Sequence, residues 1–164
     1  MNTEELERKV KRLEDRLKTL EEIEDIKKFH LDYISLYNQH RHEEMASCFT
    51  DDALLDTGVF AAARGKEEIA RVFREDIPTV NNWATAHVVV QPVITVDGNT
   101  AKGTWTMFLC FFDVPSPKGP AMRAYQALQD CEYAKVNGEW NFTSVKFICP
   151  WPSQLECRPK AAGK

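Results

Sequence analysis

Two tyrosines and one histidine are the residues of this sequence whose types and spacing could support chemistry. Tyr33 and Tyr37 lie one helical turn apart on the buried stripe of a predicted helix, where leucines would pack more simply. His87 stands near the start of the predicted strand TAHVVVQPVITVDG and is the only histidine on a predicted strand. A sheet histidine that faces two helix tyrosines would form a small polar site in an apolar cavity, as ligand pockets often do.

The imidazole of His87 suggests acid–base catalysis. A histidine titrates near neutral pH, so it can remove a proton next to a carbonyl group or help a hydroxide to leave. A tyrosine hydroxyl can donate a hydrogen bond to the oxyanion that forms. The alternative is a core histidine that is hydrogen-bonded to a neighbour and has no catalytic role.

Other reactive motifs are missing from the sequence. His40 and His42 are two residues apart and would point to different sides of a helix, so they do not predict a metal site. The five cysteines form no C-x-x-C pair, which argues against zinc and disulfides and favours a cytoplasmic protein with reduced thiols. Without a phosphate-binding loop or a Ser-His-Asp order, we expect no metal, nucleotide or other cofactor.

The composition narrows the class of protein. A chain of 164 residues with 43% hydrophobic residues predicts one globular domain with its own core. The net charge of −4 argues against a nucleic-acid-binding surface. No apolar run approaches the ~20 residues of a membrane span, and the charged start MNTEELERK does not look like a signal peptide. We therefore expect neither a nucleic-acid partner nor insertion into a membrane.

Helical periodicity dominates the first part of the chain. The stretch from Leu20 to Gly58 predicts one long amphipathic helix that runs into a short strand at Ala53–Thr57. Its inward positions are Ile23, Ile26, Phe29, Tyr33, Tyr37 and Met45. A second helix is predicted at Gly65–Asp76. Its inward positions are Ile69, Val72 and Phe73.

Strand patterns dominate the rest of the chain. Four longer strands are predicted at Thr85–Val96, Thr100–Phe112, Ala121–Val136 and Glu139–Trp151. The sequences Asp97-Gly98-Asn99 and Asn137-Gly138 join apolar runs, as hairpin turns do. Because helices come first and hairpins follow, the order indicates an α+β fold with an antiparallel sheet of about four to six strands.

Residues 4–22 differ from the rest, because their apolar side chains form a heptad seam between charged positions. The seam consists of Leu6, Val10, Leu13, Leu17 and Leu20. So narrow a stripe suits a partner helix, and we expect a homo-oligomer, either a trimer or a dimer; the alternative is packing on the chain's own domain. The predicted organisation is a coiled-coil-like helical extension at 1–22, one domain at 23–152 and a loose polar tail at 153–164.

The order of these elements resembles the SnoaL-like family of the nuclear transport factor 2-like superfamily. The histidine before an apolar strand that ends in DGNTAKG and the NGEW turn carry the resemblance, which covers roughly residues 20–150. It implies a cone-shaped, curved antiparallel sheet that is wrapped by helices around a pocket. Family members include scytalone dehydratase, bile acid dehydratase, ketosteroid isomerase, polyketide cyclases, dioxygenase small subunits and non-catalytic binding domains.

Residue by residue, the sequence is most similar to the bile acid 7α-dehydratase and scytalone dehydratase types. Tyr33 falls on a functional tyrosine of the first type, and His87 falls on the functional histidine of both. Tyr37 and Asn38 match a Tyr-Asp pair of the second type, in which the aspartate orients the histidine. The resemblance therefore implies a catalytic set of His87, Tyr33 and Asn38, with an amide in place of the carboxylate.

The resemblance also implies a large apolar pocket for a hydrophobic small molecule. Strand alternation from His87 places Val89 and Gln91 inward. The family alignment places these further residues inward on the next two strands: Trp105, Met107, Leu109, Phe111, Tyr125, Ala127, Gln129 and Cys131. Leu109 and Phe111 stand where family members have a functional aspartate and a second histidine. The expected substrate-binding residues are Tyr37, Trp105, Met107, Leu109, Phe111, Tyr125 and Gln129.

Asn38 can accept a hydrogen bond from the imidazole N–H of His87 and fix its tautomer, but it cannot stabilise imidazolium as a carboxylate does. Three aspartates could substitute for the missing carboxylate, but helix geometry or strand alternation directs each away from the pocket. They are Asp32, Asp56 and Asp130. The expected site therefore has a base without an acidic partner.

Two functions remain open from the sequence. The first is a cofactor-independent lyase or isomerase that dehydrates or rearranges a hydrophobic, steroid- or polyketide-like hydroxy-carbonyl compound, with His87 as the base. The second is a small-molecule-binding or accessory protein that has kept the pocket and lost the chemistry. An oxygenase subunit is a third possibility and would require a large partner.

Overall fold

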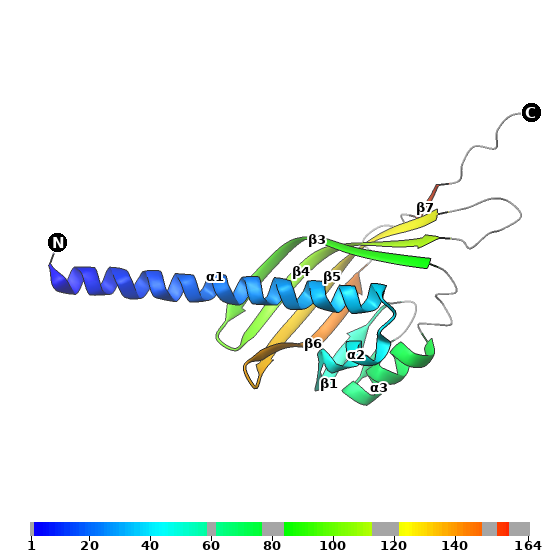
Figure 1. The fold of residues 1–164 in the computed structure, drawn as a ribbon, viewed down its shortest axis with the longest axis horizontal. Helices are drawn as coiled ribbons and strands as arrows, with labels where there is room; N and C mark the ends of the chain where they lie inside the picture. The colour runs from blue at the N-terminus through cyan, green and yellow to red at the C-terminus, as the bar shows by residue number, and fades with distance from the viewer. Residues whose placement is uncertain (1, 59–61, 77–83, 113–121, 149–153, 158–164) are drawn as a thin grey trace, which may run out of the picture.

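The computed structural model describes residues 2–58, 62–76, 84–112, 122–148 and 154–157, and within them the chain has an α+β fold (Figure 1). Its helical part consists of α1 (Thr3–Asn38), α2 (His42–Ser47) and α3 (Lys66–Arg71), which continues into a π-helical turn, η1 (Val72–Asp76). Its strands are β1 (Phe49–Asp56), β2 (Ala62–Arg64), β3 (Ala84–Asp97), β4 (Thr100–Phe112), β5 (Met122–Val136), β6 (Glu139–Ile148) and β7 (Gln154–Cys157).

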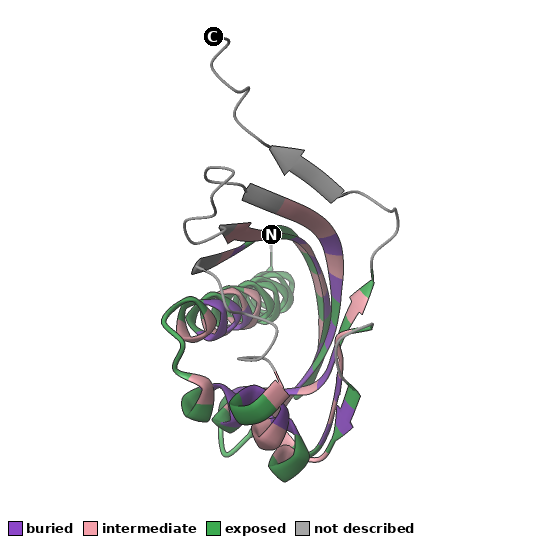
Figure 2. Cartoon of the chain, turned by 90° about the vertical axis from the view of Figure 1, so that its right-hand side faces the viewer, coloured by how far each residue is buried: buried purple, intermediate pink, exposed green. Residues whose placement is uncertain are grey.

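The strands form one curved sheet in the order β2-β1-β6-β5-β4-β3, with β7 paired to β5. Figure 2 shows this sheet curving around the helices, with α1 seen end-on on the inner side of the curve. The inner face and the helices enclose the hydrophobic core, in which Phe49 of β1 packs on Phe142 of β6 with ring centroids 5.3 Å apart. The cone-shaped α+β architecture expected from the sequence is confirmed.

Two details of the sheet differ from the prediction. β1 and β6 run parallel, although every other strand pair in the described part of the chain is antiparallel. Within the described ranges, the sheet also has seven strands rather than four to six. Parallel pairing joins segments far apart in the sequence and needs no hairpin turn, so local turn signals cannot reveal it.

The two long hairpins form at the predicted turns. Gly98 has φ 57° between β3 and β4, and Asn137 and Gly138 have φ 53° and 89° between β5 and β6. These left-handed conformations are the ones that Asn-Gly and Asp-Gly turns supply at low cost. The predicted bounds of the second of the four longer strands, Thr100–Phe112, match β4.

The long helix ends earlier than predicted. α1 begins after Asn2, whose Oδ1 accepts a hydrogen bond from the Glu5 N–H at 2.9 Å, and it stops at Asn38. There His40 adopts φ 57°, and the Arg41 N–H bonds the Leu36 carbonyl at 3.0 Å, which together form a Schellman stop. The chain then forms the separate helix α2, so the prediction of one helix through Met45 is wrong.

Three further predictions need correction. Gln91 has φ 53° in a bulge between Val90 and Val93, and the bulge turns its side chain outward instead of inward. The first strand starts at Phe49 rather than Ala53. The tail, predicted to be loose, contains β7, whose Gln154–Cys157 backbone pairs with Met122–Tyr125 of β5. Residues 149–151 of the last predicted strand lie outside the described residues.

Candidate functional site

His87 lies on the inner face of the edge strand β3 and is only 3% exposed. It stands directly opposite Leu109 of β4, which in turn stands opposite Tyr125 of β5. The imidazole packs against two aromatic rings, Tyr37 at 4.1 Å and Phe111 at 6.2 Å between centroids. Phe111 continues to Tyr125 at 5.6 Å. We call Tyr37, His87, Phe111 and Tyr125 the aromatic row.

The imidazole of His87 is neutral at physiological pH. Burial, with a smaller electrostatic contribution from His40, lowers its pKa from 6.5 to about 4. Its Nδ1 atom is buried and has no hydrogen-bond partner among the described residues. The titration near neutrality that the residue type suggested is therefore displaced, and the ring is a weak but unprotonated base.

Asn38 contacts the backbone of His87 and not its ring. The Asn38 Oδ1 accepts a hydrogen bond from the His87 N–H at 2.8 Å, and the Asn38 Nδ2 donates one to the His87 carbonyl at 2.9 Å. The amide thus pairs with the edge strand as another strand would. The expectation that Asn38 fixes the imidazole tautomer directly is wrong in this geometry, although the pairing does position the residue that carries the ring.

Tyr33 is buried on α1 but lies apart from His87. Its ring packs on Phe142 at 4.9 Å, on Phe49 at 5.8 Å and on His30 at 6.3 Å. Burial raises its pKa well above the ordinary value, so the phenol stays protonated. Neither a hydrogen bond nor a ring contact joins these two described residues, Tyr33 and His87. Of the two helix tyrosines, Tyr37 is the one in contact with the imidazole.

A second polar group, which the sequence analysis did not single out as a site, lies deeper in the core. His30 is fully buried and stacks on Trp105 with centroids 4.1 Å apart. Its Nε2 is 2.9 Å from the Gln129 Oε1, and its Nδ1 is 3.0 Å from the Tyr133 hydroxyl, which also accepts a hydrogen bond from the Trp105 Nε1–H at 2.9 Å. We call these four residues the buried polar cluster.

The hydrogen bonds define the proton positions in this cluster. With the amide oriented as in the structure, the Gln129 oxygen can only accept, so the His30 Nε2 must carry a proton and donate it. The His30 Nδ1 then accepts from the Tyr133 hydroxyl. Burial lowers the pKa of His30 to about 4, which agrees with a neutral ring.

One polar atom of the cluster remains unsatisfied. The Gln129 Nε2 is buried and lacks a hydrogen-bond partner within the described part of the chain. A buried amide donor without a partner costs free energy, so such an atom commonly faces a water molecule or a ligand. Together, His87 and Gln129 present two unpaired polar atoms from the inner face of the sheet.

Two residues of this cluster could have been found from the sequence. His30 lies three residues before Tyr33 on the same helical stripe, and Tyr133 continues the alternation of Gln129 and Cys131 on β5. Gly103 makes room for Tyr133, because a Cβ atom there would lie 3.1 Å from the Tyr133 ring. A glycine in the middle of a strand is a sign of such a close approach.

The predicted pocket residues divide into two groups. Trp105, Met107 and Gln129 are fully buried, and Leu109, Phe111 and Tyr125 are half-buried on the same face. The half-buried group lies toward the ends of β4 and β5 that lead into residues 113–121, which lie outside the described residues. The enclosure of this face into a pocket and its role in ligand binding therefore remain predictions.

Of the three aspartates that could replace the carboxylate, Asp32 and Asp56 make other contacts and Asp130 is exposed. Asp32 is exposed and pairs with Lys28 at 3.3 Å, and Asp130 is exposed. Asp56 accepts a hydrogen bond from the Gly58 N–H at 2.9 Å. Among the described residues, no group of three or more His, Cys, Asp or Glu side chains could hold a metal ion. The described helices include none with the length and hydrophobicity that a membrane-spanning segment needs.

The sequence profile of the SnoaL-like domain matches residues 18–146, so the chain belongs to the SnoaL-like family within the nuclear transport factor 2-like superfamily. The resemblance found in the sequence is thereby confirmed. No curated protein sequence matches the chain significantly.

Solved structures share the fold at low sequence identity. A nuclear transport factor 2-like protein from Novosphingobium aromaticivorans is 20% identical, with a TM-score of 0.71 over 86% of this chain and 90% of that chain. A scytalone dehydratase-like protein from the same organism is 18% identical, with a TM-score of 0.69 over 87% and 92%. A hexachlorocyclohexane dehydrochlorinase from Novosphingobium barchaimii is 16% identical, with a TM-score of 0.69 over 85% and 94%.

Proposed function

We propose that the protein is a cofactor-independent lyase or isomerase of the dehydratase type, with His87 as the general base. The observation that supports this most directly is the buried, neutral imidazole whose Nδ1 has no partner among the described residues. A base needs a free lone pair and a position beside the substrate, and the aromatic row suits a flat hydrophobic molecule. The proposed substrate is a steroid- or polyketide-like hydroxy-carbonyl compound.

The proposed step is an elimination. His87 takes the proton from the carbon next to the carbonyl group, and the electron pair of the C–H bond forms an enolate. The Tyr37 hydroxyl, on the ring that packs against His87, donates a hydrogen bond to the enolate oxygen. The imidazolium then returns its proton to the β-hydroxyl as the C–O bond breaks, which releases water and leaves an enone.

The lowered pKa of His87 affects the two halves of this step differently. A ring with a pKa of about 4 is a weak base, which slows proton removal. The imidazolium that forms is a correspondingly strong acid, which favours protonation of the leaving hydroxyl. Names of similar structures agree with this reaction class, because scytalone dehydratase and hexachlorocyclohexane dehydrochlorinase are both named for eliminations.

Steady-state assays on a panel of steroidal and polyketide-like β-hydroxy ketones, with enone absorbance as the readout, test the proposal. We expect His87→Ala to lower kcat/KM by about 10²- to 10⁴-fold, the usual contribution of a general base, while ligand affinity changes little. Val88→Ala is the control, because Val88 is the next residue on β3 and its side chain is exposed. Unchanged turnover in His87→Ala would exclude this histidine as the base.

The second candidate is a binding protein without catalysis. It is favoured by the contacts of Asn38, whose side chain is used to hold the His87 backbone and leaves the imidazole without a carboxylate partner. Ligand binding in the micromolar range, about −8 kcal/mol, without turnover or exchange of the α-proton into deuterated water would support this function. Tyr37→Phe and Tyr33→Phe separate the two tyrosines, and we expect the larger loss of turnover for Tyr37→Phe.

A further inference from the structure

The first five turns of α1 project from the body of the protein and expose an apolar stripe (Figure 1). All residues from Asn2 to Glu21 are exposed, and Glu22 is the first to contact the sheet. The stripe, which we call the seam, is between 42% and 59% exposed at each of its members: Leu6, Val10, Leu13, Leu17 and Leu20. Leucines placed this regularly in water indicate a missing contact.

The seam faces away from the protein's own sheet. At 100° per residue, its mean direction lies about 150° around the helix from the stripe that buries Ile26, His30 and Tyr33. The domain therefore cannot cover the seam without breaking α1. The seam also has a defined end, because Glu24 and Lys27 occupy the next two seam positions and pair with each other at 2.7 Å.

The charges beside the seam identify the partner. On one flank the heptad e positions are all acidic: Glu7, Glu14 and Glu21. On the other flank the g positions Lys9 and Arg16 are basic. In a parallel pair of identical helices, each g residue meets the e residue of the next heptad, so Lys9 faces Glu14 of the partner subunit and Arg16 faces Glu21 of the partner subunit. An antiparallel pair would place like charges together.

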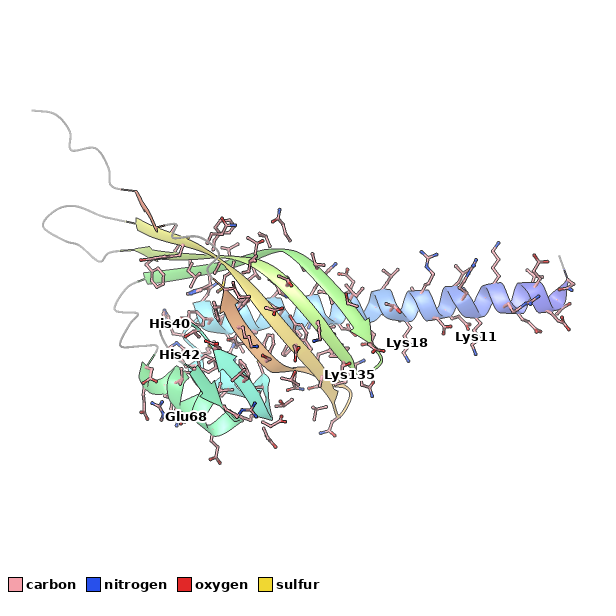
Figure 3. The ribbon with its side chains drawn as sticks, turned by 180° about the vertical axis from the view of Figure 1, so that it is seen from behind. Lys11, Lys18, His40, His42, Glu68 and Lys135 are labelled. Carbon is pink, nitrogen blue, oxygen red and sulfur yellow. The ribbon has the colours of Figure 1, made fainter. Side chains whose placement is uncertain are left out.

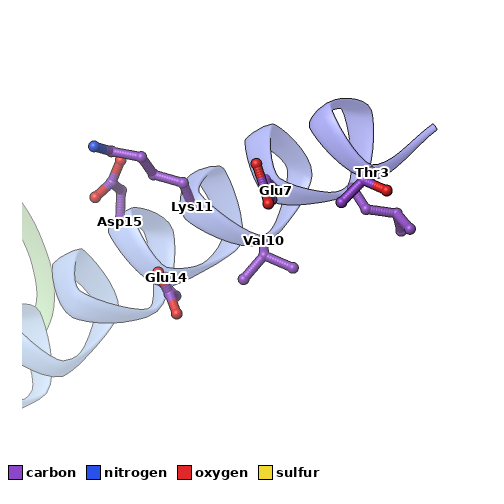
Figure 4. A pocket seen from close by; sticks show the side chains of 7 residues that line it. Thr3, Glu7, Val10, Lys11, Glu14 and Asp15 are labelled. Atoms are coloured by element: carbon purple, nitrogen blue, oxygen red, sulfur yellow. The ribbon is translucent and has the colours of Figure 1, made fainter. Parts of the chain in front are cut away.

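We propose that the seam binds the same segment of a second copy of this chain, in parallel and in register, as a two-stranded coiled coil. Val10 at an a position and leucines at all three d positions favour two strands. Figure 4 shows the shallow hollow beside Val10. Thr3, Leu6, Glu7 and Val10 line it and form the four-residue hole that a d-position leucine enters. Because the seams face away from the sheets, the two domains lie on opposite outer sides.

Sedimentation equilibrium of the full chain tests the proposal. The wild type should show a species of twice the 18.8 kDa chain mass, and Leu13→Asp/Leu17→Asp should be monomeric. Lys9→Glu/Arg16→Glu should weaken association by at least tenfold, since it turns four attractive pairs into repulsive ones. Adding Glu14→Lys/Glu21→Lys to that variant should restore association. In an antiparallel pair, like charges would face each other before and after Lys9→Glu/Arg16→Glu, so this variant would leave the association nearly unchanged.

The matched control is Lys11→Glu/Lys18→Glu, which makes the same charge change at b positions away from the seam (Figure 3). It should leave the dissociation constant within about twofold. A monomeric wild type, or a dimer whose affinity is unchanged by the leucine substitutions, would overturn the proposal. A dimer whose affinity Lys9→Glu/Arg16→Glu leaves unchanged would overturn the parallel orientation, and a trimer would overturn the two-stranded assignment.

Discussion

Asn38 connects the end of the long helix to the edge of the sheet. Its amide satisfies both the N–H and the carbonyl of His87, at 2.8 Å and 2.9 Å, and so replaces the neighbouring strand that an edge strand lacks. Through this pairing, the C-terminal end of α1 fixes the positions of both the Tyr37 ring and the His87 backbone. Asn38 is therefore a positioning residue for the proposed base.

An Asn38→Asp substitution tests this interpretation. A carboxylate can accept from the His87 N–H but cannot donate to the His87 carbonyl, which it would repel, so we expect a loss of about 1–3 kcal/mol in the free energy of unfolding in urea. Gln39→Glu makes the same amide-to-acid change at an exposed neighbour and should cost within about 0.5 kcal/mol. Native stability with faster turnover in Asn38→Asp would indicate instead that position 38 acts on the imidazole.

Strand alternation from His87, together with the family resemblance for the next two strands, predicted which residues are buried better than it predicted their contacts. The burial of His87, Trp105 and Gln129 follows from period-two alternation along strands with regular pairing. The same alternation gave the wrong side for Gln91. The bulge after Val90 adds a residue to the strand, so each following side chain points to the opposite face of the sheet. The contact of Asn38 with the His87 backbone could not be predicted from the sequence either. The two residues are 49 positions apart, and their contact depends on where the end of the helix meets the sheet.

Glu22 connects α1 to the sheet through an ion pair and hydrogen bonds, at the point where the helix begins to project from the domain. Lys135 of β5 donates to both of its carboxylate oxygens at 2.6 Å, and the Trp140 Nε1–H donates at 3.0 Å. The Lys135 and Glu22 side chains are only 21% and 14% exposed, and the ammonium lies 5.4 Å from the centroid of the Trp140 ring. The hydrogen bond from Lys135 lowers the pKa of Glu22, as expected for a carboxylate stabilised by its partner.

Replacing this carboxylate should loosen the helix. We expect Glu22→Gln to lower the free energy of unfolding by about 1–3 kcal/mol, because the mostly buried Lys135 loses its counter-charge. Glu24→Gln is the matched control, since the exposed Glu24–Lys27 pair should contribute less than about 1 kcal/mol. Both are measured by urea unfolding and by hydrogen exchange along α1. Equal effects of the two substitutions would contradict a special role for Glu22.

The elements that the sequence predicts well are those with local signals. The hairpins β3–β4 and β5–β6 follow from apolar runs that meet at an Asp-Gly turn and an Asn-Gly turn. The separation of α1 from α2 did not follow, because the αL residue that stops α1 is His40 and not the usual glycine or asparagine. The short strand β2 has only three residues and depends on its pairing with β1.

At the level of the whole molecule, two buried histidines link folding to pH. Burial lowers the pKa values of His30 and His87 to about 4, whereas both titrate near 6.5 in the unfolded chain. Between these values the unfolded chain binds protons that the folded chain does not. Stability is therefore fully present above about pH 6.5 and is lost as the pH falls toward 4. The lowered pKa of Glu22 acts with the same sign at lower pH.

The free energy of unfolding should consequently fall by about 2 kcal/mol per histidine between pH 7 and pH 5. His87→Gln is the clearer test of the two, because the His87 Nδ1 has no partner to lose, whereas His30 would lose two buried hydrogen bonds. Urea unfolding is measured at a series of pH values. Between pH 7 and pH 5, the free energy of unfolding of His87→Gln should fall by about half as much as that of the wild type, whatever the variant's stability at pH 7. An unchanged slope would mean that the pKa of His87 in the folded protein stays close to its unfolded value of about 6.5. That result would contradict the burial-lowered pKa from which the proposed elimination draws a weak base and a strong conjugate acid, and it would move the expected pH dependence of turnover to near pH 6.5.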